Sequence, residues 1–246
     1  RILDLSHNGL SGVLDDRFKK LEVLHFQYNT MTGPIPNTFF NDDSVMQRLN
    51  VGANQMNGTI PGEVGLASKM TGLYVFENDF EGTIPVLGNM PLRQFHGQRN
   101  RFAGILPFDL FIGVWAETIS EWWVFENEMT GQLSQNLGLF PNLQDFRVGN
   151  NRFVGNIPSS IYTLGQLFRL ELNDNLLTGT IDTMIGNLTS LETIDLTGNG
   201  FTGVVPTEIA DIDVLKSVKL QFNALAGDIP TGLCFLTSME LLEADC

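Results

Sequence analysis

Apolar and polar residues alternate in short runs along the chain, and these runs recur at a nearly constant interval. Runs such as Leu170-x-Leu172 and Ile194-x-Leu196 have the period of two that places successive side chains on opposite faces of a β-strand. We therefore expect ten short strands whose apolar members point into a core and whose intervening residues face outward.

An asparagine closes each of these runs. The ten positions are Asn8, Asn29, Asn54, Asn78, Asn100, Asn127, Asn151, Asn175, Asn199 and Asn223, and the intervals between them run from 21 to 27 residues, most often 24. Repeats of this length predict a solenoid, because one repeat cannot bury its apolar face alone whereas stacked repeats form a parallel sheet over a continuous core. The asparagine amide can donate and accept hydrogen bonds where the chain leaves the sheet, so these ten residues are interpreted as a structural ladder between adjacent turns.

After the asparagine come Leu, Met or Phe, then Gly, and in many repeats an apolar residue followed by proline. These pairs are Ile35-Pro36, Ile60-Pro61, Ile84-Pro85, Ile157-Pro158, Val205-Pro206 and Ile229-Pro230. The pattern L-x-G-x-I-P resembles the plant-type leucine-rich-repeat family. The resemblance implies an α/β repeat fold: a right-handed solenoid with a concave parallel sheet and, on the convex side, short helices or 3-10 turns such as 158–167 and 206–215.

Four places depart from the family pattern. Leu133-Ser134 and Ile181-Asp182 lack the proline, and Gly97 replaces an apolar core residue. The 27-residue interval around Trp115 to Trp122 adds three residues, for which we expect a local bulge.

The repeats predict a single leucine-rich-repeat domain over residues 1–246, with an eleventh strand starting at Leu242 and a C-terminal capping region from about residue 231. Arg1 stands directly before a strand pattern, with no initiator Met or signal peptide, which is typical of a fragment. The most apolar stretch, 105–125, contains three carboxylates and so does not predict a membrane helix. Membrane attachment would therefore come only through segments absent from this sequence.

Composition and cysteine placement point to a secreted protein. The chain has 14 Lys and Arg against 28 Asp and Glu, a net charge of −14, which argues against nucleic acid as a partner. Cys234 and Cys246 predict an oxidised cap, in which they pair with each other or Cys246 pairs with a residue beyond the fragment. The sequons at Asn57 and Asn187 favour glycosylation and an extracellular or cell-surface location.

The residues four and two places before each ladder asparagine should form the outward, concave face. On three successive strands they include an aromatic cluster flanking a histidine, with an arginine next to it: Tyr74, Phe76, His96, Trp123, Phe125 and Arg147. Exposed aromatic area is typical of binding sites. The alternative is that these rings stack across the strands and only stabilise the sheet.

Charged residues of alternating sign lie beside this cluster in two predicted rows. One row is Glu77, Arg99 and Glu126, and the other is Asp79, Arg101, Glu128 and Arg152. The alternation favours cross-strand ion pairs that contribute about 0–1 kcal/mol each. The alternative is that Arg99, Arg101, Arg147 and Arg152 recognise a charged peptide or an acidic sugar.

No arrangement of residues in the sequence predicts catalysis, a metal site or a cofactor. His7, His25 and His96 fall on separated strands, and no nucleophile elbow, P-loop or dinucleotide fingerprint occurs in a suitable setting. We therefore expect a protein that is not an enzyme.

The leading hypothesis is an extracellular recognition module, resembling a leucine-rich-repeat receptor ectodomain, that binds a peptide, protein or glycan on its concave face and could engage a co-receptor. One alternative is a soluble secreted inhibitor of polysaccharide-degrading enzymes. Another is a surface or ice-adsorbing structural protein, against which stands the variation of the concave residues from strand to strand.

Overall fold

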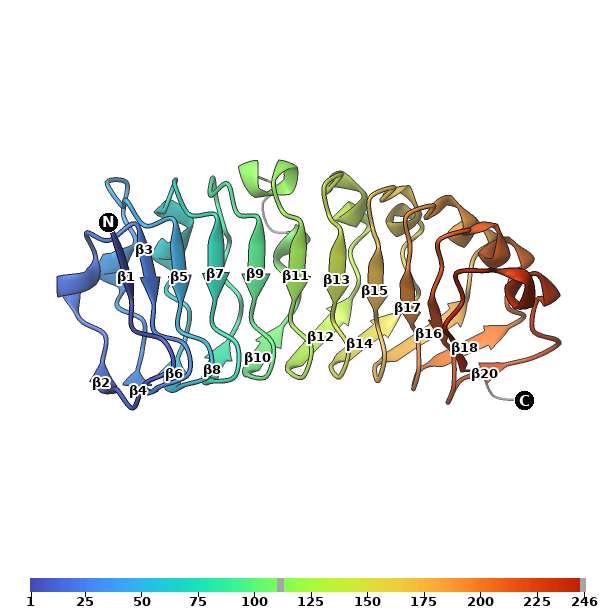
Figure 1. The fold of residues 1–246 in the computed structure, drawn as a ribbon, viewed down its shortest axis with the longest axis horizontal. Coiled ribbons are helices and arrows are strands. Elements are labelled where there is room, and N and C mark those ends of the chain that lie inside the picture. The colour runs from blue at the N-terminus through green and yellow to red at the C-terminus, as the bar shows by residue number, and fades with distance from the viewer. Residues whose placement is uncertain (110–112, 244–246) are drawn as a thin grey trace. The chain divides into compact units, whose positions relative to one another are not determined.

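The computed structural model describes residues 1–109 and 113–243 of the chain. Two compact units follow one another along the chain, Arg1–Met129 and Thr130–Cys246. Both units repeat one motif, in which a strand of a first sheet is followed by a tight turn, a strand of a second sheet and, in most repeats, a short 3-10 helix (Figure 1).

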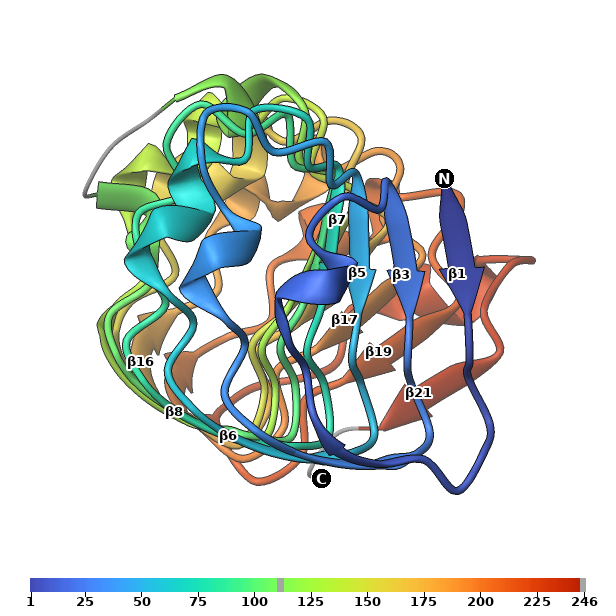
Figure 2. The ribbon, with the colours of Figure 1, turned by 90° about the vertical axis from the view of Figure 1, so that its left-hand side faces the viewer.

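In the first unit, six strands of the first sheet run parallel, each pairing with the equivalent strand of the next repeat. They are β1 (Ile2–Asp4), β3 (Val23–His25), β5 (Arg48–Asn50), β7 (Gly72–Tyr74), β9 (Gln94–His96) and β11 (Glu121–Trp123). The second sheet contains β2 (Ser11–Val13), β4 (Thr30–Gly33), β6 (Gln55–Gly58), β8 (Asp79–Gly82) and β10 (Arg101–Gly104). The 3-10 helices are η1 (Asp16–Phe18), η2 (Asn37–Phe39), η3 (Gly62–Leu66), η4 (Pro107–Asp109) and η5 (Val114–Glu117). Figure 2 shows β1, β3, β5 and β7 side by side, with the coiled ribbons of η2 and η3 across the interior from them.

The second unit has the same construction, and β12 (Glu128–Gln132) contains the boundary between the units. Its first sheet consists of β13 (Asp145–Arg147), β15 (Arg169–Glu171), β17 (Thr193–Asp195), β19 (Ser217–Lys219) and β21 (Leu241–Glu243). Its second sheet contains β14 (Arg152–Gly155), β16 (Leu176–Thr180), β18 (Gly200–Gly203) and β20 (Ala224–Leu225). The 3-10 helices are η6 (Gln135–Leu139), η7 (Ser159–Thr163), η8 (Thr183–Asn187), η9 (Thr207–Asp211) and η10 (Thr231–Phe235).

The parallel strands and the 3-10 turns confirm the leucine-rich-repeat solenoid that the spacing predicted. The central residue of each inner first-sheet strand, for example Leu49 or Leu170, is fully buried, as the alternating pattern requires. The strand β21 occupies the predicted place of an eleventh strand. The second sheet was not predicted from the sequence.

The ladder asparagines join successive turns. Asn54 Nδ2 donates to the carbonyl of Phe26 in the preceding turn at 3.0 Å and to that of Val51 in its own turn, while its Oδ1 accepts from Met31 N at 2.9 Å. The same bridge recurs, for example, at Asn29, Asn78, Asn100, Asn127, Asn175, Asn199 and Asn223. Each bridge satisfies backbone groups that the turn leaves without a strand partner.

The proline positions begin the 3-10 helices. Prolines such as Pro61 and Pro158 stand at the N-cap with an extended backbone. Where proline is missing, a polar side chain takes over: Ser134 Oγ accepts from Asn136 N, and Asp182 accepts from Met184 N. Capping by a hydroxyl or carboxylate therefore explains why these two repeats depart from the family pattern.

The 27-residue interval contains a buried aromatic cluster. Trp115 of η5 and Trp122 of β11 are fully buried, with Phe108 stacked on Trp115 at 5.3 Å and Phe95 stacked on Trp122 at 4.6 Å. The bulge expected around Trp115 to Trp122 stays a prediction, and residues 110–112 of the same interval lie outside the described residues. The space above Gly97 is filled by the Phe95 ring, which a Cβ would meet at 2.7 Å.

Candidate functional site

The first unit presents a row of three contacting rings on its first sheet. Tyr74, His96 and Trp123 are register partners on β7, β9 and β11. The rings of His96 and Trp123 lie parallel with their centroids 3.8 Å apart, and Tyr74 meets His96 edge-on at 5.0 Å. Cross-strand stacking of this kind stabilises a sheet, so these rings have a structural role whatever they bind.

Polar groups lock the row in place. Glu121 accepts from Gln94 Nε2 at 2.8 Å and lies 2.9 Å from His96 Nε2, while the Tyr74 hydroxyl donates to Gln94. Burial raises the pKa of Tyr74, which Arg48 partly offsets, so the phenol stays protonated and keeps donating at neutral pH. The polar groups around the stacked rings are thus largely engaged with one another.

A second row lies one step further along the same strands. Phe76, Gln98 and Phe125 follow the strand ends, and the N–H groups of Glu77 and Arg99 donate to the carbonyls of Gln98 and Phe125 at 2.9 and 3.0 Å. Phe76 and Phe125 are partly exposed, whereas Gln98 between them is buried. This row offers apolar surface that the ring stack does not use.

The Phe76 ring reaches across the neighbouring strand. It covers Gly52, and its edge contacts Tyr28 with the ring centroids 6.2 Å apart. Phe125 lies 6.0 Å from the Arg99 guanidinium. The sequence grouped Phe76 with the rings around His96, but in the structure it packs toward β3 and β5.

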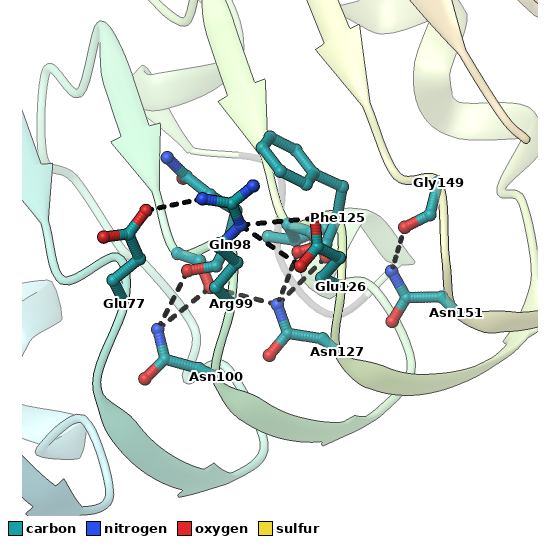
Figure 3. A network of polar contacts seen from close by, with 11 residues as sticks. Glu77, Gln98, Arg99, Asn100, Phe125, Glu126, Asn127, Gly149 and Asn151 are labelled. Atoms are coloured by element: carbon teal, nitrogen blue, oxygen red, sulfur yellow. Dashed lines mark hydrogen bonds and ion pairs between the residues drawn. The ribbon is translucent and has the colours of Figure 1, made fainter. Parts of the chain in front are cut away.

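Arg99 lies between two carboxylates, as Figure 3 shows. Its Nη1 is 2.7 Å from Glu77 Oε1 and its Nε is 3.1 Å from Glu126 Oε2. Glu77, Arg99 and Glu126 have φ values of 51°, 57° and 55°, so the left-handed backbone presents them at the same point of three successive turns. Both carboxylates raise the pKa of Arg99, which stays charged. We call these three side chains the Glu-Arg-Glu row.

The other predicted arginines have acidic neighbours as well. In the first unit, Arg101 Nη2 is 3.5 Å from Asp79 Oδ1. In the second unit, Arg147 makes two hydrogen bonds of 2.7 Å to the buried carboxylate of Asp145. Three of the four arginines considered for anion recognition are thus paired with carboxylates of this chain, and the fourth, Arg152, belongs to β14 of the second unit.

Two polar members of the site were missed by sequence reasoning. Gln94 and Glu121 lie six places before a ladder asparagine, and only the positions four and two places before it were considered. Continuing the alternation by one more step would have placed both on the outward face. Gln98, two places before Asn100, was expected on the outward face, but its burial there leaves no signal in its own sequence position.

Other candidate residues are distributed over the two units. Asn57 of β6 and Asn187 of η8 are exposed. Cys234 is an exposed free thiol in the structure, and Cys246 lies outside the described residues, so the pairing stays a prediction. Within residues 1–109 and 113–243 there is no group of three potential metal ligands and no helix suited in length and apolarity to span a bilayer.

Comparison with known proteins finds leucine-rich repeats and plant receptor-like proteins. A family profile described as Leucine Rich Repeat matches residues 1–21 and 190–212. Receptor-like protein 43 of Arabidopsis thaliana is 34% identical over 113 residues, which are 45% of this chain and 16% of that protein. Receptor-like protein 41 of the same plant is 30% identical over 94 residues, 36% of this chain and 11% of that protein. The matched stretches are therefore a small part of the relatives' length.

Solved structures similar to this chain include plant receptor ectodomains. The plant peptide hormone receptor RGFR1 in complex with RGF2 has a TM-score of 0.92 at 25% identity, covering 99% of this chain and 39% of that one. The ectodomain of the Arabidopsis receptor kinase HAESA, in complex with an extended IDA peptide hormone, has a TM-score of 0.89 at 28% identity, covering 98% and 41%. A plant ice-binding protein has a TM-score of 0.73 at 21% identity, covering 96% and 78%, a likeness that concerns the fold alone.

Proposed function

Because this chain is a leucine-rich-repeat protein of the plant type, similar to receptor ectodomains, we propose that it is an extracellular recognition module. Its ligand is a peptide bound on the outward face of β7, β9 and β11. The observation that carries the proposal is the presence of partly exposed aromatic side chains on three adjacent strands, the feature that protein-binding surfaces use as anchors.

A peptide suits this face better than a glycan. Sugar hydroxyls need free polar partners beside an aromatic ring, but Tyr74, Gln94 and Glu121 are already hydrogen-bonded in one network. The similar structures of RGFR1 and HAESA are complexes with peptide hormones. HAESA is also solved with the co-receptor SERK1, and we include a co-receptor in the proposal.

An extracellular location is supported by the two sequons. Both acceptor asparagines, Asn57 and Asn187, are exposed, as are the hydroxyl-bearing residues Thr59 and Thr189. Neither acceptor lies on the first sheet, so attached glycans would leave the aromatic side chains of β7, β9 and β11 uncovered.

The test is a surface-plasmon-resonance screen of the protein against immobilised secreted peptides and oligosaccharides. A Trp123→Ala, Phe125→Ala double variant should bind a peptide hit at least about tenfold more weakly, because two anchor rings are lost. Phe235→Ala removes an aromatic side chain that is 81% exposed in the second unit and serves as the matched control. Unchanged affinity of a correctly folded double variant would remove the site from this face.

A further inference from the structure

Acidic residues predominate beside the row of Phe76, Gln98 and Phe125. The Glu-Arg-Glu row and the adjoining second-sheet residues Asp79, Glu81, Arg101 and Glu128 together contain five carboxylates and two arginines, a net charge of −3. Their proximity follows from the Arg99 and Arg101 ion pairs and from the register of Arg101 with Glu81 and of Ala103 with Glu128. An anionic ligand would be repelled here, since both arginines already face carboxylates.

Gln98 supplies a second and independent observation. Its side chain is 9% exposed, and among the described residues none hydrogen-bonds its buried Oε1. A buried carboxamide oxygen without a donor is costly, and a ligand N–H would satisfy it. Figure 3 shows Gln98 beside the guanidinium of Arg99, whose side chain is 51% exposed and can turn away to admit a donor.

Phe125, in the repeat after Gln98, supplies partly exposed apolar surface. The Phe76 ring lies away from Gln98, over Gly52, whereas the Phe125 ring lies 6.0 Å from the Arg99 guanidinium. A partly exposed ring in this position can pack against an aliphatic chain. Lysine and arginine combine such a chain with a terminal cation.

We propose that this face takes a basic peptide, with the stem of a lysine or arginine against Phe125 and its cation at Glu77 and Glu126. A peptide N–H donates to Gln98 Oε1. The ligand cation is held by two carboxylates that at present share Arg99, and Glu77 Oε2 has no hydrogen-bond partner among the described residues. This inference rests on the proposed function and specifies the charge of its ligand.

The experiment is selection of a phage-displayed library of random octapeptides on the immobilised protein. Lysine and arginine should be enriched and aspartate and glutamate depleted among the selected peptides. Replacing the basic residue of a selected peptide by citrulline, which keeps the shape and removes the charge, should weaken binding about tenfold. Selection of acidic peptides, or of peptides without charge preference, overturns the inference.

Variants of the protein locate the effect. Glu77→Gln combined with Glu126→Gln should abolish the preference for the basic peptide over its citrulline form, whereas Gln98→Met should weaken both forms equally. Glu208→Gln in η9 changes the net charge outside the first unit and should preserve the preference. An equal loss of preference in Glu208→Gln would show that net charge, and not the carboxylates of Glu77 and Glu126, selects the peptide.

Failure of this inference can be told apart from failure of the proposed function. If neutral or acidic peptides bind, and Trp123→Ala with Phe125→Ala removes that binding, the face recognises peptides but the basic assignment is wrong. If no octapeptide and no immobilised ligand binds in a manner that depends on Trp123 and Phe125, both are wrong. Far-ultraviolet circular dichroism and thermal unfolding establish that each variant is folded.

Discussion

The residue before a ladder asparagine adopts a left-handed backbone. Among residues 1–109 and 113–243, nine residues other than glycine have φ between 51° and 60°, and all of them stand at this point of their repeats. Such a conformation costs about 1–2 kcal/mol for a residue with a Cβ. It persists because the N–H of that residue still bonds to the next turn, as when Ala53 N donates to Phe76 O at 2.7 Å.

Ala53 allows this cost to be measured without changing a polar contact. Ala53→Gly should raise the free energy of unfolding by a few tenths to about 1 kcal/mol, because relief of the left-handed strain exceeds the added freedom of the unfolded chain. Ala53→Val should lower it by about 1–2 kcal/mol, since a β-branched residue tolerates this conformation worst. Urea unfolding of the three proteins gives the comparison.

Ala103 in β10 is the control with the opposite expectation. It lies in a strand and is not among the residues with positive φ. There, glycine should destabilise and valine should be tolerated, because strands favour β-branched residues. The same order of stabilities at both positions would contradict the assignment of strain to the left-handed turn.

Glycines on the first sheet provide sockets for neighbouring side chains. A Cβ on Gly52 would lie 2.3 Å from Phe76 Cε1, and a Cβ on Gly149 would lie 2.2 Å from Asn173 Oδ1. Both glycines stand where the alternating pattern places an outward side chain. A missing side chain on one strand therefore sets the position of a side chain from the next.

This arrangement predicts a specific coupling between β5 and β7. Gly52→Ala should lower the free energy of unfolding by about 1–3 kcal/mol, because the Phe76 ring must leave its socket. In a Phe76→Ala background the same change should cost far less, and the difference is read from a double-mutant cycle in urea. Gly62→Ala, with no atom within 4 Å of the new Cβ, is the control. Equal costs in both backgrounds would show that Phe76 does not depend on the socket.

The acidic side chain of β15 should make stability depend on pH. Burial raises the pKa of Glu171 above its ordinary value, and Arg147 and Arg169 only partly oppose this shift. The folded protein therefore keeps the proton at a pH where the unfolded chain has lost it. The free energy of unfolding should consequently fall as the pH rises from about 4.5 through the raised pKa of Glu171. Well below pH 4.5 the carboxyl is protonated in both the folded and the unfolded state, so Glu171 causes no change of stability with pH there.

Glu171→Gln tests the origin of this slope. In urea unfolding between about pH 4.5 and pH 7, the free energy of unfolding should decline less steeply with pH for the variant than for the unchanged protein. This comparison of slopes holds even if the two proteins differ in absolute stability. Glu240→Gln, an exposed glutamate just before β21, should leave the slope nearly as it was. An equally steep decline after Glu171→Gln would assign the pH dependence to other groups.

At the scale of the whole molecule, the repeat spacing predicted the features that most repeats share. The first sheet, the asparagine bridges and the 3-10 turns depend on residues that recur at fixed intervals, so one sequence is enough to detect them. The second sheet was missed although its residues also recur, as Met31 and Gly33 of β4 and Phe80 and Gly82 of β8 illustrate, because one apolar residue before a glycine does not make the alternating run that predicts a strand. The aromatic site was predicted only as a set of outward positions.

The contacts within that site could not be predicted for a physical reason. Whether Phe76 points toward His96 or toward Tyr28 depends on the empty place at Gly52, and whether Arg99 can meet an anion depends on carboxylates one turn before and after it. Both depend on the direction in which side chains point across neighbouring strands. The spacing of residues along one strand carries no information about that direction. The charge of the proposed ligand consequently changes from the acidic alternative considered in the sequence to a basic one.

Both sequons lie off the first sheet, in β6 and η8. When the protein is expressed through a eukaryotic secretory pathway, it should carry glycans at the exposed Asn57 and Asn187. Enzymatic deglycosylation should then lower its mass by two glycans, and Asn57→Gln or Asn187→Gln should each reduce that loss by one glycan. Because both sites lie off the first sheet, treated and untreated protein should bind a selected peptide with equal affinity. Glycans that weaken binding would place the ligand on the second sheet or the 3-10 turns instead, and Trp123→Ala, measured in parallel, separates the two locations.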